Sequence, residues 1–182
     1  MKSFLLLLIV AAQVATGQSQ APTAPTEMLM HTETAFSLVL RLPYAETAPL
    51  FGPEGERPWA GKHWDPQFIY PRPAHDTEGA VFTVKHGAFS AVWVNTAFDV
   101  EARHFQYVYF IPELMVTTID VRFKSLNQAT TQVNVVYART AVTADGNEHV
   151  VAMTEGDKSA GKDWQQAIDS YLATRKTAGT SQ

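Results

Sequence analysis

Between residues 79 and 142, apolar and polar side chains alternate in successive segments separated only by short connectors. In one of these segments Met115, Val121 and Phe123 share one side, while charged residues occupy the other. Alternation with a period of two is typical of strands that bury one face, and such short connectors leave no room for a crossover helix. The sequence therefore predicts an antiparallel meander, with strands at residues 79–86, 89–98, 104–111, 114–125 and 130–142.

Two elements are expected before the meander. Residues 35–42 alternate in the same way, which predicts one more strand at the start of the domain. Residues 44–51 predict a short helix, which would end at the Gly52-Pro53 pair. The chain would thus run from a first strand through a helical excursion into the meander.

The C-terminal part of the chain has a different period. From Asn147 to about Thr174, apolar residues recur every three or four positions, which predicts a helix with Asp145 or Asn147 as its N-cap. Gly156 and Gly161 would each cost this helix about 1 kcal/mol relative to alanine. We expect a continuous or slightly kinked helix, in which a small residue is needed where another part of the protein comes close.

These elements predict an α+β architecture. An antiparallel sheet of six to seven strands needs a cover for its apolar face, and the terminal helix is the only long element available for this. At 1.5 Å per residue it would span about 40 Å. A strongly curved sheet wrapped around one helix leaves space between them, so a cavity with an apolar or aromatic lining is expected.

The N-terminus has the pattern of an export signal. Lys2 precedes an apolar run over residues 4–12, and the small residues Ala15 and Gly17 would place cleavage after Gly17. The run is too short to span a bilayer. Residues 1–17 are therefore predicted to be a signal peptide, and residues 18–33 a flexible spacer. The domain would cover residues 34–175, followed by a disordered tail at 176–182, and the protein would be secreted or periplasmic, without stable membrane insertion once the signal is removed.

Composition narrows the possible partners. The formal net charge is −4, and loss of Lys2 with the signal would make it more negative by one charge. Such a chain is not expected to bind nucleic acid or an anionic membrane. Because the sequence has no cysteine, disulfides, thiol chemistry and thiolate metal sites are excluded. The oligomeric state is left open.

Residues 51–71 carry the most distinctive motif. The pattern runs from Phe51-Gly52-Pro53-Glu54-Gly55-Glu56 to Trp59 and Trp64 and is followed by a tryptophan-containing strand and the long terminal helix. It resembles the SRPBCC superfamily, which includes START domains, birch-pollen-allergen-like proteins and polyketide cyclase-like proteins. The resemblance covers about residues 35–174. It implies a helix-grip fold with a pocket for a hydrophobic ligand, but it implies no fixed catalytic set.

We therefore predict a site for a small hydrophobic ligand, formed by aromatic residues and one aliphatic residue of the motif, the strands and the terminal helix. Neither a cofactor nor a metal is expected, and no catalytic residue is assigned. The predicted ligand-binding residues are Trp59, Trp64, Trp93, Phe105, Tyr107, Tyr109, Tyr137, Trp164 and Ile168.

Several residues allow more than one interpretation. Glu54, Glu56, Arg57 and Asp65 could perform acid–base chemistry at the pocket mouth, but we favour ion pairs and hydrogen bonds that orient the helical excursion. Arg139 could meet a ligand carboxylate, although extension to the pocket rim is favoured.

Two further patterns are weak. His86 and His104 could approach each other across neighbouring strands and hold a metal, against a simpler role at the surface. The run from Gly156 to Lys162 has phosphate-loop spacing, but Asp163 stands where Ser or Thr is needed.

Two functions remain after the sequence analysis. The favoured one is an exported binding protein that holds its ligand without reacting it. The alternative is a polyketide cyclase or aromatase-like enzyme that uses the same cavity.

Overall fold

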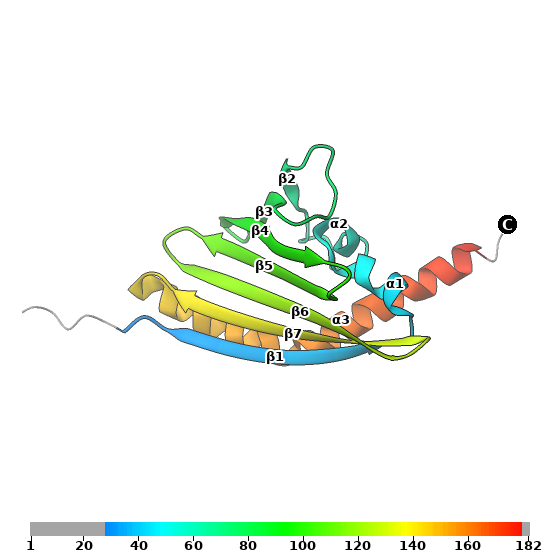
Figure 1. Ribbon diagram of the computed structural model, residues 1–182. Helices are drawn as coiled ribbons and strands as arrows, with labels where there is room; N and C mark the ends of the chain where they lie inside the picture. Colours follow the sequence, from blue (N-terminus) through cyan, green and yellow to red (C-terminus); the bar gives the residue numbers. More distant parts are fainter. Residues whose placement is uncertain (1–27, 180–182) are drawn as a thin grey trace, which may run out of the picture.

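The computed structural model describes residues 28–179. Within them a first strand, a helical excursion and six further strands precede one long helix (Figure 1). The elements are β1 (His31–Leu40), α1 (Tyr44–Thr47), a 3₁₀ turn η1 (Ala48–Phe51), α2 (Pro53–Glu56), β2 (Gln67–Tyr70), β3 (Val81–His86), β4 (Phe89–Asp99), β5 (His104–Ile111), β6 (Met115–Asn127), β7 (Thr130–Ala141) and α3 (Ala144–Gly179).

The seven strands form one sheet in the order β1-β7-β6-β5-β4-β3-β2, and every neighbouring pair is antiparallel. From β2 to β7 each strand pairs with the next one in the chain, which confirms the predicted meander. The first strand closes the far edge by pairing with the last. The connector from β5 to β6 is short enough that Ile111 pairs with Met115, as expected for hairpin-linked strands.

Alternation decides which side of the sheet is buried. The register aligns Tyr107 with Ile119 and Ile119 with Tyr137, so side chains of three neighbouring strands share the inner face. Along β6, buried and partly exposed residues alternate from Met115 to Val121. Burial of these apolar side chains is the main stabilising contribution of the fold. Fully buried members of this core include Leu40, Phe82, Phe105, Met115, Val133 and Val135.

Helix α3 covers this inner face as one continuous helix of 36 residues, about 54 Å at 1.5 Å per residue (Figure 1). It packs mainly against β1 and has fewer contacts with β7 and β6. Gly161 lies where the helix passes over β1, since a Cβ there would be 3.2 Å from Phe36. Gly156 faces open space. The expected close approach therefore holds for one of the two glycines.

The start of α3 differs from the prediction. The helix begins at Ala144, and the Thr143 hydroxyl caps it by accepting a hydrogen bond from Gly146 N at 3.2 Å. Asn147 instead accepts a hydrogen bond from Met30 N at 2.7 Å, which ties the chain entering β1 to the helix. Asp145 and Asn147 were therefore the wrong choice of N-cap, because Thr143 is placed by the end of β7 rather than by a helical pattern.

Two boundaries and one strand also differ from the prediction. β1 begins at His31, so residues 31–33, predicted as spacer, belong to the sheet. α3 continues to Gly179, so the predicted tail is wrong for residues 176–179. β2 was not predicted, because its four residues lie between Pro66 and Pro71 and look like a loop. The predicted signal peptide and most of the spacer lie outside the described residues.

In the described part of the chain, no helix has the length and apolar character needed to cross a membrane.

Candidate functional site

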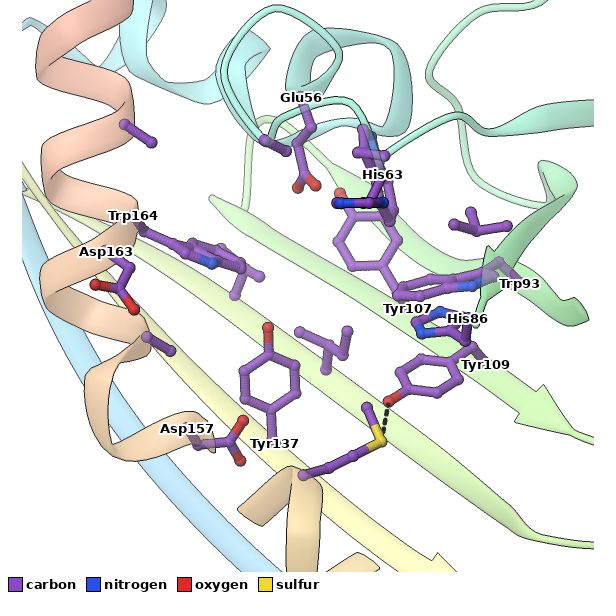
Figure 2. A pocket seen from close by; sticks show the side chains of 18 of the residues that line it. Glu56, His63, His86, Trp93, Tyr107, Tyr109, Tyr137, Asp157, Asp163 and Trp164 are labelled. Carbon is purple, nitrogen blue, oxygen red and sulfur yellow. Dashed lines mark hydrogen bonds between the residues drawn. The ribbon is translucent and has the colours of Figure 1, made fainter. Parts of the chain in front are cut away.

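A cavity of about 490 Å³ lies between the inner face of the sheet and α3. Side chains line it from α2 and the loop after it, from β3 to β7, and from the middle of α3 (Figure 2). Known pockets for small organic molecules have volumes of about 300–1,000 Å³. The cavity is therefore large enough for a ligand of that class.

Aromatic rings dominate the cavity wall. Trp93 stacks on Tyr109 with ring centroids 4.3 Å apart, and Trp64 meets Trp93 edge to face at 5.2 Å. On the side of α3, Trp59 and Trp164 meet at 5.4 Å. Rings held in such offset and edge-to-face contacts form a rigid surface that suits a flat apolar molecule.

The polar tips of three wall residues are bound to one short stretch of backbone. Trp59 Nε1 donates to Leu50 O at 2.7 Å, and Trp64 Nε1 donates to Pro53 O at 2.9 Å. The Tyr107 hydroxyl donates to Phe51 O. The turn from η1 to α2 therefore fixes these rings, and their apolar surfaces are left to line the cavity.

One end of the cavity is polar. Arg139 on β7 forms a bidentate ion pair with Asp157 on α3, with Nη2 2.9 Å from Oδ1. The Thr34 hydroxyl also donates to Asp157, at 2.6 Å, and the guanidinium lies 4.5 Å from the centre of the Tyr137 ring. Burial alone would lower the pKa of Arg139, but the hydrogen bond to Asp157 and neighbouring charges raise it.

The Arg139 pair corrects one expectation. The side chain does not extend to the rim, since only 3 % of it is exposed. Its charge is compensated by Asp157, so it is a structural link between sheet and helix at the polar end of the cavity. Burial raises the pKa of Tyr137 far above its usual range, so this neighbouring hydroxyl stays neutral.

Glu56 is the carboxyl that enters the aromatic part of the cavity. It is the last residue of α2, and its side chain points inward (Figure 2). It is partly exposed by surface area, and because it lines the cavity, some of that surface faces the cavity. Desolvation and the charge of Asp76 raise the pKa of Glu56 well above its ordinary value.

His86 is a second polar group on the wall. Its ring stacks on Tyr109, with centroids 5.4 Å apart, and lies parallel to Trp93 at 6.0 Å. Burial lowers its pKa, which favours the neutral imidazole. Its buried Nε2 has no hydrogen-bond partner within the described residues.

Seven of the nine predicted site residues lie on the cavity wall, which places them together without testing ligand binding. These seven are Trp59, Trp64, Trp93, Tyr107, Tyr109, Tyr137 and Trp164.

The other two, Phe105 and Ile168, are completely buried and are not among the residues that line the cavity. Phe105 stacks on Phe98 at 4.0 Å and meets Phe123 at 4.9 Å. Both face inward as expected, but their positions along β5 and α3 place them in solid core. The periodicity of a strand or helix predicts which face a residue occupies. It does not predict whether the residue's position along that element lies beside the cavity.

The charged cluster of the motif divides into two parts. Arg57 contacts the carboxylates of Glu54 and Asp65, both at 2.8 Å, and also donates to Pro66 O. This network ties α2 to the following loop, as the favoured interpretation expected. Glu56 has a different role, which the sequence analysis missed by grouping it with its neighbours. The signal was its spacing, since residues two apart on a helix point in nearly opposite directions.

The two histidines considered for a metal do not meet. β4 separates β3, which carries His86, from β5, which carries His104. His104 Nε2 is instead 2.6 Å from Asp120 Oδ2. Among residues 28–179, no three His, Asp or Glu side chains form a group suited to a metal ion.

No known protein family and no curated protein matches the sequence. Solved structures do match. The Mll3558 protein from Rhizobium loti is 12 % identical with a TM-score of 0.56 and covers 80 % of this chain and 99 % of its own. The hypothetical protein jhp0584 from Helicobacter pylori is 7 % identical, with a TM-score of 0.58 and coverage of 77 % and 87 %.

Another similar structure is Ara h 8.0201, which is 13 % identical with a TM-score of 0.55. It covers 80 % of this chain and 99 % of its own. This chain has a helix-grip fold. Identities this low establish the fold alone, which confirms the predicted α+β architecture. The functional argument has to come from the cavity itself.

Proposed function

We propose that the protein is a binding protein of the SRPBCC type that holds a small hydrophobic or aromatic ligand between its sheet and α3. The observation that supports this proposal is the cavity of about 490 Å³ with aromatic walls. Natural cores are close-packed, so a space of this size needs an occupant or stays open at a cost in stability. An apolar ligand would bury its surface against rings that are already held in place.

We also propose that the protein is exported. The apolar run over residues 4–12 and the small residues before Gln18 support this proposal. Mass spectrometry of the protein recovered from its native host should then show a chain that begins at Gln18. Recovery of a chain that still begins at Met1 would contradict export by this route.

Binding can be tested with the apolar dye N-phenylnaphthylamine, whose emission rises in apolar surroundings. We expect saturable binding of one dye per protein. Ala160 on α3 lines the cavity, so Ala160→Phe should fill part of the space and weaken dye binding by about tenfold or more, equivalent to about 1.4 kcal/mol.

The matched control is Ala152→Phe, which places the same ring on an exposed position of the same helix. It should leave dye binding unchanged. Equal loss of dye binding in both variants would indicate a general effect on the helix. Absence of any saturable dye binding to the wild-type protein would contradict the proposal.

A cyclase or aromatase-like enzyme is the second candidate, and Glu56 favours it. A carboxyl with a raised pKa inside an apolar cavity has the property of a general acid or base. If Glu56 moves protons, the protein should speed the exchange of the α-hydrogens of a bound aromatic ketone for deuterium, as followed by NMR. An exchange rate that is the same in Glu56→Gln would remove this candidate.

A further inference from the structure

Helix α2 holds Glu56 in a fixed position. The Asp76 carboxylate accepts hydrogen bonds from Glu54 N at 2.8 Å and Gly55 N at 3.2 Å. Gly55 lies so close to the preceding turn that a Cβ would be 1.8 Å from Pro49 O. α2 is therefore fixed at its start and packed against η1, and the Glu56 side chain is directed into the cavity (Figure 2).

The Glu56 carboxyl makes no hydrogen bond or ion pair with any of the described residues. Two donors near it have other acceptors. Arg57 donates hydrogen bonds to Glu54, Asp65 and the backbone, and the Tyr107 hydroxyl donates to Phe51 O. A polar group on an aromatic wall without a protein partner requires one from water or from a ligand.

The surrounding groups favour a protonated carboxyl. Burial and the charge of Asp76, in the loop after β2, raise the pKa of Glu56 well above its usual range. The tyrosines that face it from β5 and β7, Tyr107 and Tyr137, have pKa values raised by burial and stay neutral. A protonated carboxyl offers one O–H donor and one carbonyl acceptor.

Other charged or titratable groups also line the cavity. The Arg139 charge is compensated by Asp157. Lys85 and Asp163 are exposed residues that reach the cavity from β3 and α3, and His63 reaches it from the loop after α2. A ligand carboxylate near Glu56 would meet the negative field of Asp76, and Arg139 is already paired with Asp157.

We propose that Glu56 is the polar anchor of the ligand, and that the ligand is an uncharged aromatic molecule whose carbonyl oxygen accepts a hydrogen bond from this carboxyl. The inference rests on the proposed binding function and specifies its ligand class. The aromatic part of the ligand contacts the tryptophan rings of the cavity lining. The hydrogen bond to the carbonyl fixes the orientation of the ligand. Apolar contacts supply most of the affinity, and the single hydrogen bond supplies selectivity.

Two dyes distinguish a hydrogen bond from Glu56 from binding in the cavity in general. Prodan is a naphthyl ketone and can accept the hydrogen bond, whereas N-phenylnaphthylamine has no carbonyl. In Glu56→Leu, prodan binding should weaken by about tenfold, while N-phenylnaphthylamine binding should change by less than about twofold. In Glu56→Gln, whose amide still donates, prodan binding should stay within about threefold of wild type.

The control is Glu46→Leu, which removes an exposed acid from α1 outside the cavity lining and should leave both dyes unaffected. Circular dichroism and thermal midpoints check that each variant is folded. Prodan affinity should also fall as the pH rises through the raised pKa of Glu56 in wild type, because a carboxylate cannot donate. The Glu56→Gln protein should show no such dependence.

Unchanged prodan binding in Glu56→Leu would contradict the role of Glu56 as polar anchor. The proposed binding function would still hold, provided that N-phenylnaphthylamine binds. Equal loss of both dyes in Glu56→Leu would also contradict the anchor role, because the residue would then act on cavity shape. If neither dye binds the wild-type protein, the proposed function fails and the anchor fails with it.

Discussion

Arg139 and Asp157 illustrate how single residues join the two layers of this fold. One belongs to β7 and the other to α3, and their side chains are only 3 % and 9 % exposed. A buried pair adds little net stability compared with apolar residues, but the loss of one member leaves an uncompensated charge in the interior. The pair is therefore a sensitive point for testing the packing of helix on sheet.

We predict that Asp157→Asn destabilises the protein by about 3 kcal/mol, because Arg139 would remain buried with its charge uncompensated. Denaturant unfolding followed by circular dichroism measures this change. Glu155→Gln is the control, since it removes an exposed partner of Lys158 on the same helix and should cost less than about 1 kcal/mol. Similar losses in the two variants would show that the interior pair has no special role.

Glu56 predicts a dependence of stability on pH. Its pKa in the folded protein is raised above the ordinary value of 4.5, so the folded state holds a proton that the unfolded chain has already lost. The stability from this residue is complete below the unfolded pKa and is lost as the pH rises through the folded pKa, with a slope of up to about 1.4 kcal/mol per pH unit.

Glu56→Gln should remove this slope. The variant should match the wild type near pH 4 and exceed it in free energy of unfolding at higher pH, because an amide carries no charge to desolvate. Denaturant titrations of both proteins across this range provide the test. Parallel curves would mean that Glu56 ionises without cost in the folded state.

The sequence could place aromatic residues on the inner face. The spacing of Glu54 and Glu56 predicts that they point apart, but it could not show which of them enters the cavity. Both are acids of one four-residue helix, and only the orientation of α2 against the sheet directs one to the cavity and the other to Arg57. Nor could the sequence show that Phe105 lies outside the cavity lining. Its side chain faces inward, but its position in β5 places it beside Phe98 and Phe123.

At the scale of elements, the five meander strands were predictable because each buries one face and is long enough to show the period. β2 was not, since four residues between prolines show no period, and pairing with β3 creates the strand. The expected course of α3 is confirmed, since the helix runs without interruption through Gly156 and Gly161. Tertiary packing outweighs the poor helix propensity of glycine there.

The two helix glycines should respond differently to alanine. Gly156→Ala should stabilise the protein by about 0.5–1 kcal/mol, because nothing lies within 4 Å of the added Cβ and alanine restricts the unfolded chain. Gly161→Ala should gain less or lose stability, because Phe36 would be 3.2 Å away. Thermal and denaturant unfolding measure both. An equal gain at the two sites would contradict the close packing of α3 on β1.

At the scale of the whole molecule, the cavity follows from the placement of α3. The helix packs mainly on β1, with fewer contacts to β7 and β6, and side chains of β3, β4 and β5 line the space that it leaves. The sequence predicted a helix over a curved sheet and therefore a cavity. It could not show that the helix would lie towards one edge, because that depends on the packing of Gly161 against Phe36.

A ligand that occupies this cavity should stabilise the entire domain. Binding to the folded state alone adds about 2.7 kcal/mol when the free ligand is at about 100 times its dissociation constant. The thermal midpoint should therefore rise with N-phenylnaphthylamine concentration in wild type and much less in Ala160→Phe. A midpoint independent of dye concentration in the wild-type protein would contradict binding to a folded-state cavity.

The four tryptophans of the chain all line this cavity. The intrinsic ultraviolet emission of the protein therefore originates almost entirely from the surface that a guest would touch. An occupant should alter that signal without any attached label, so the unmodified protein is its own optical sensor for compounds screened against it.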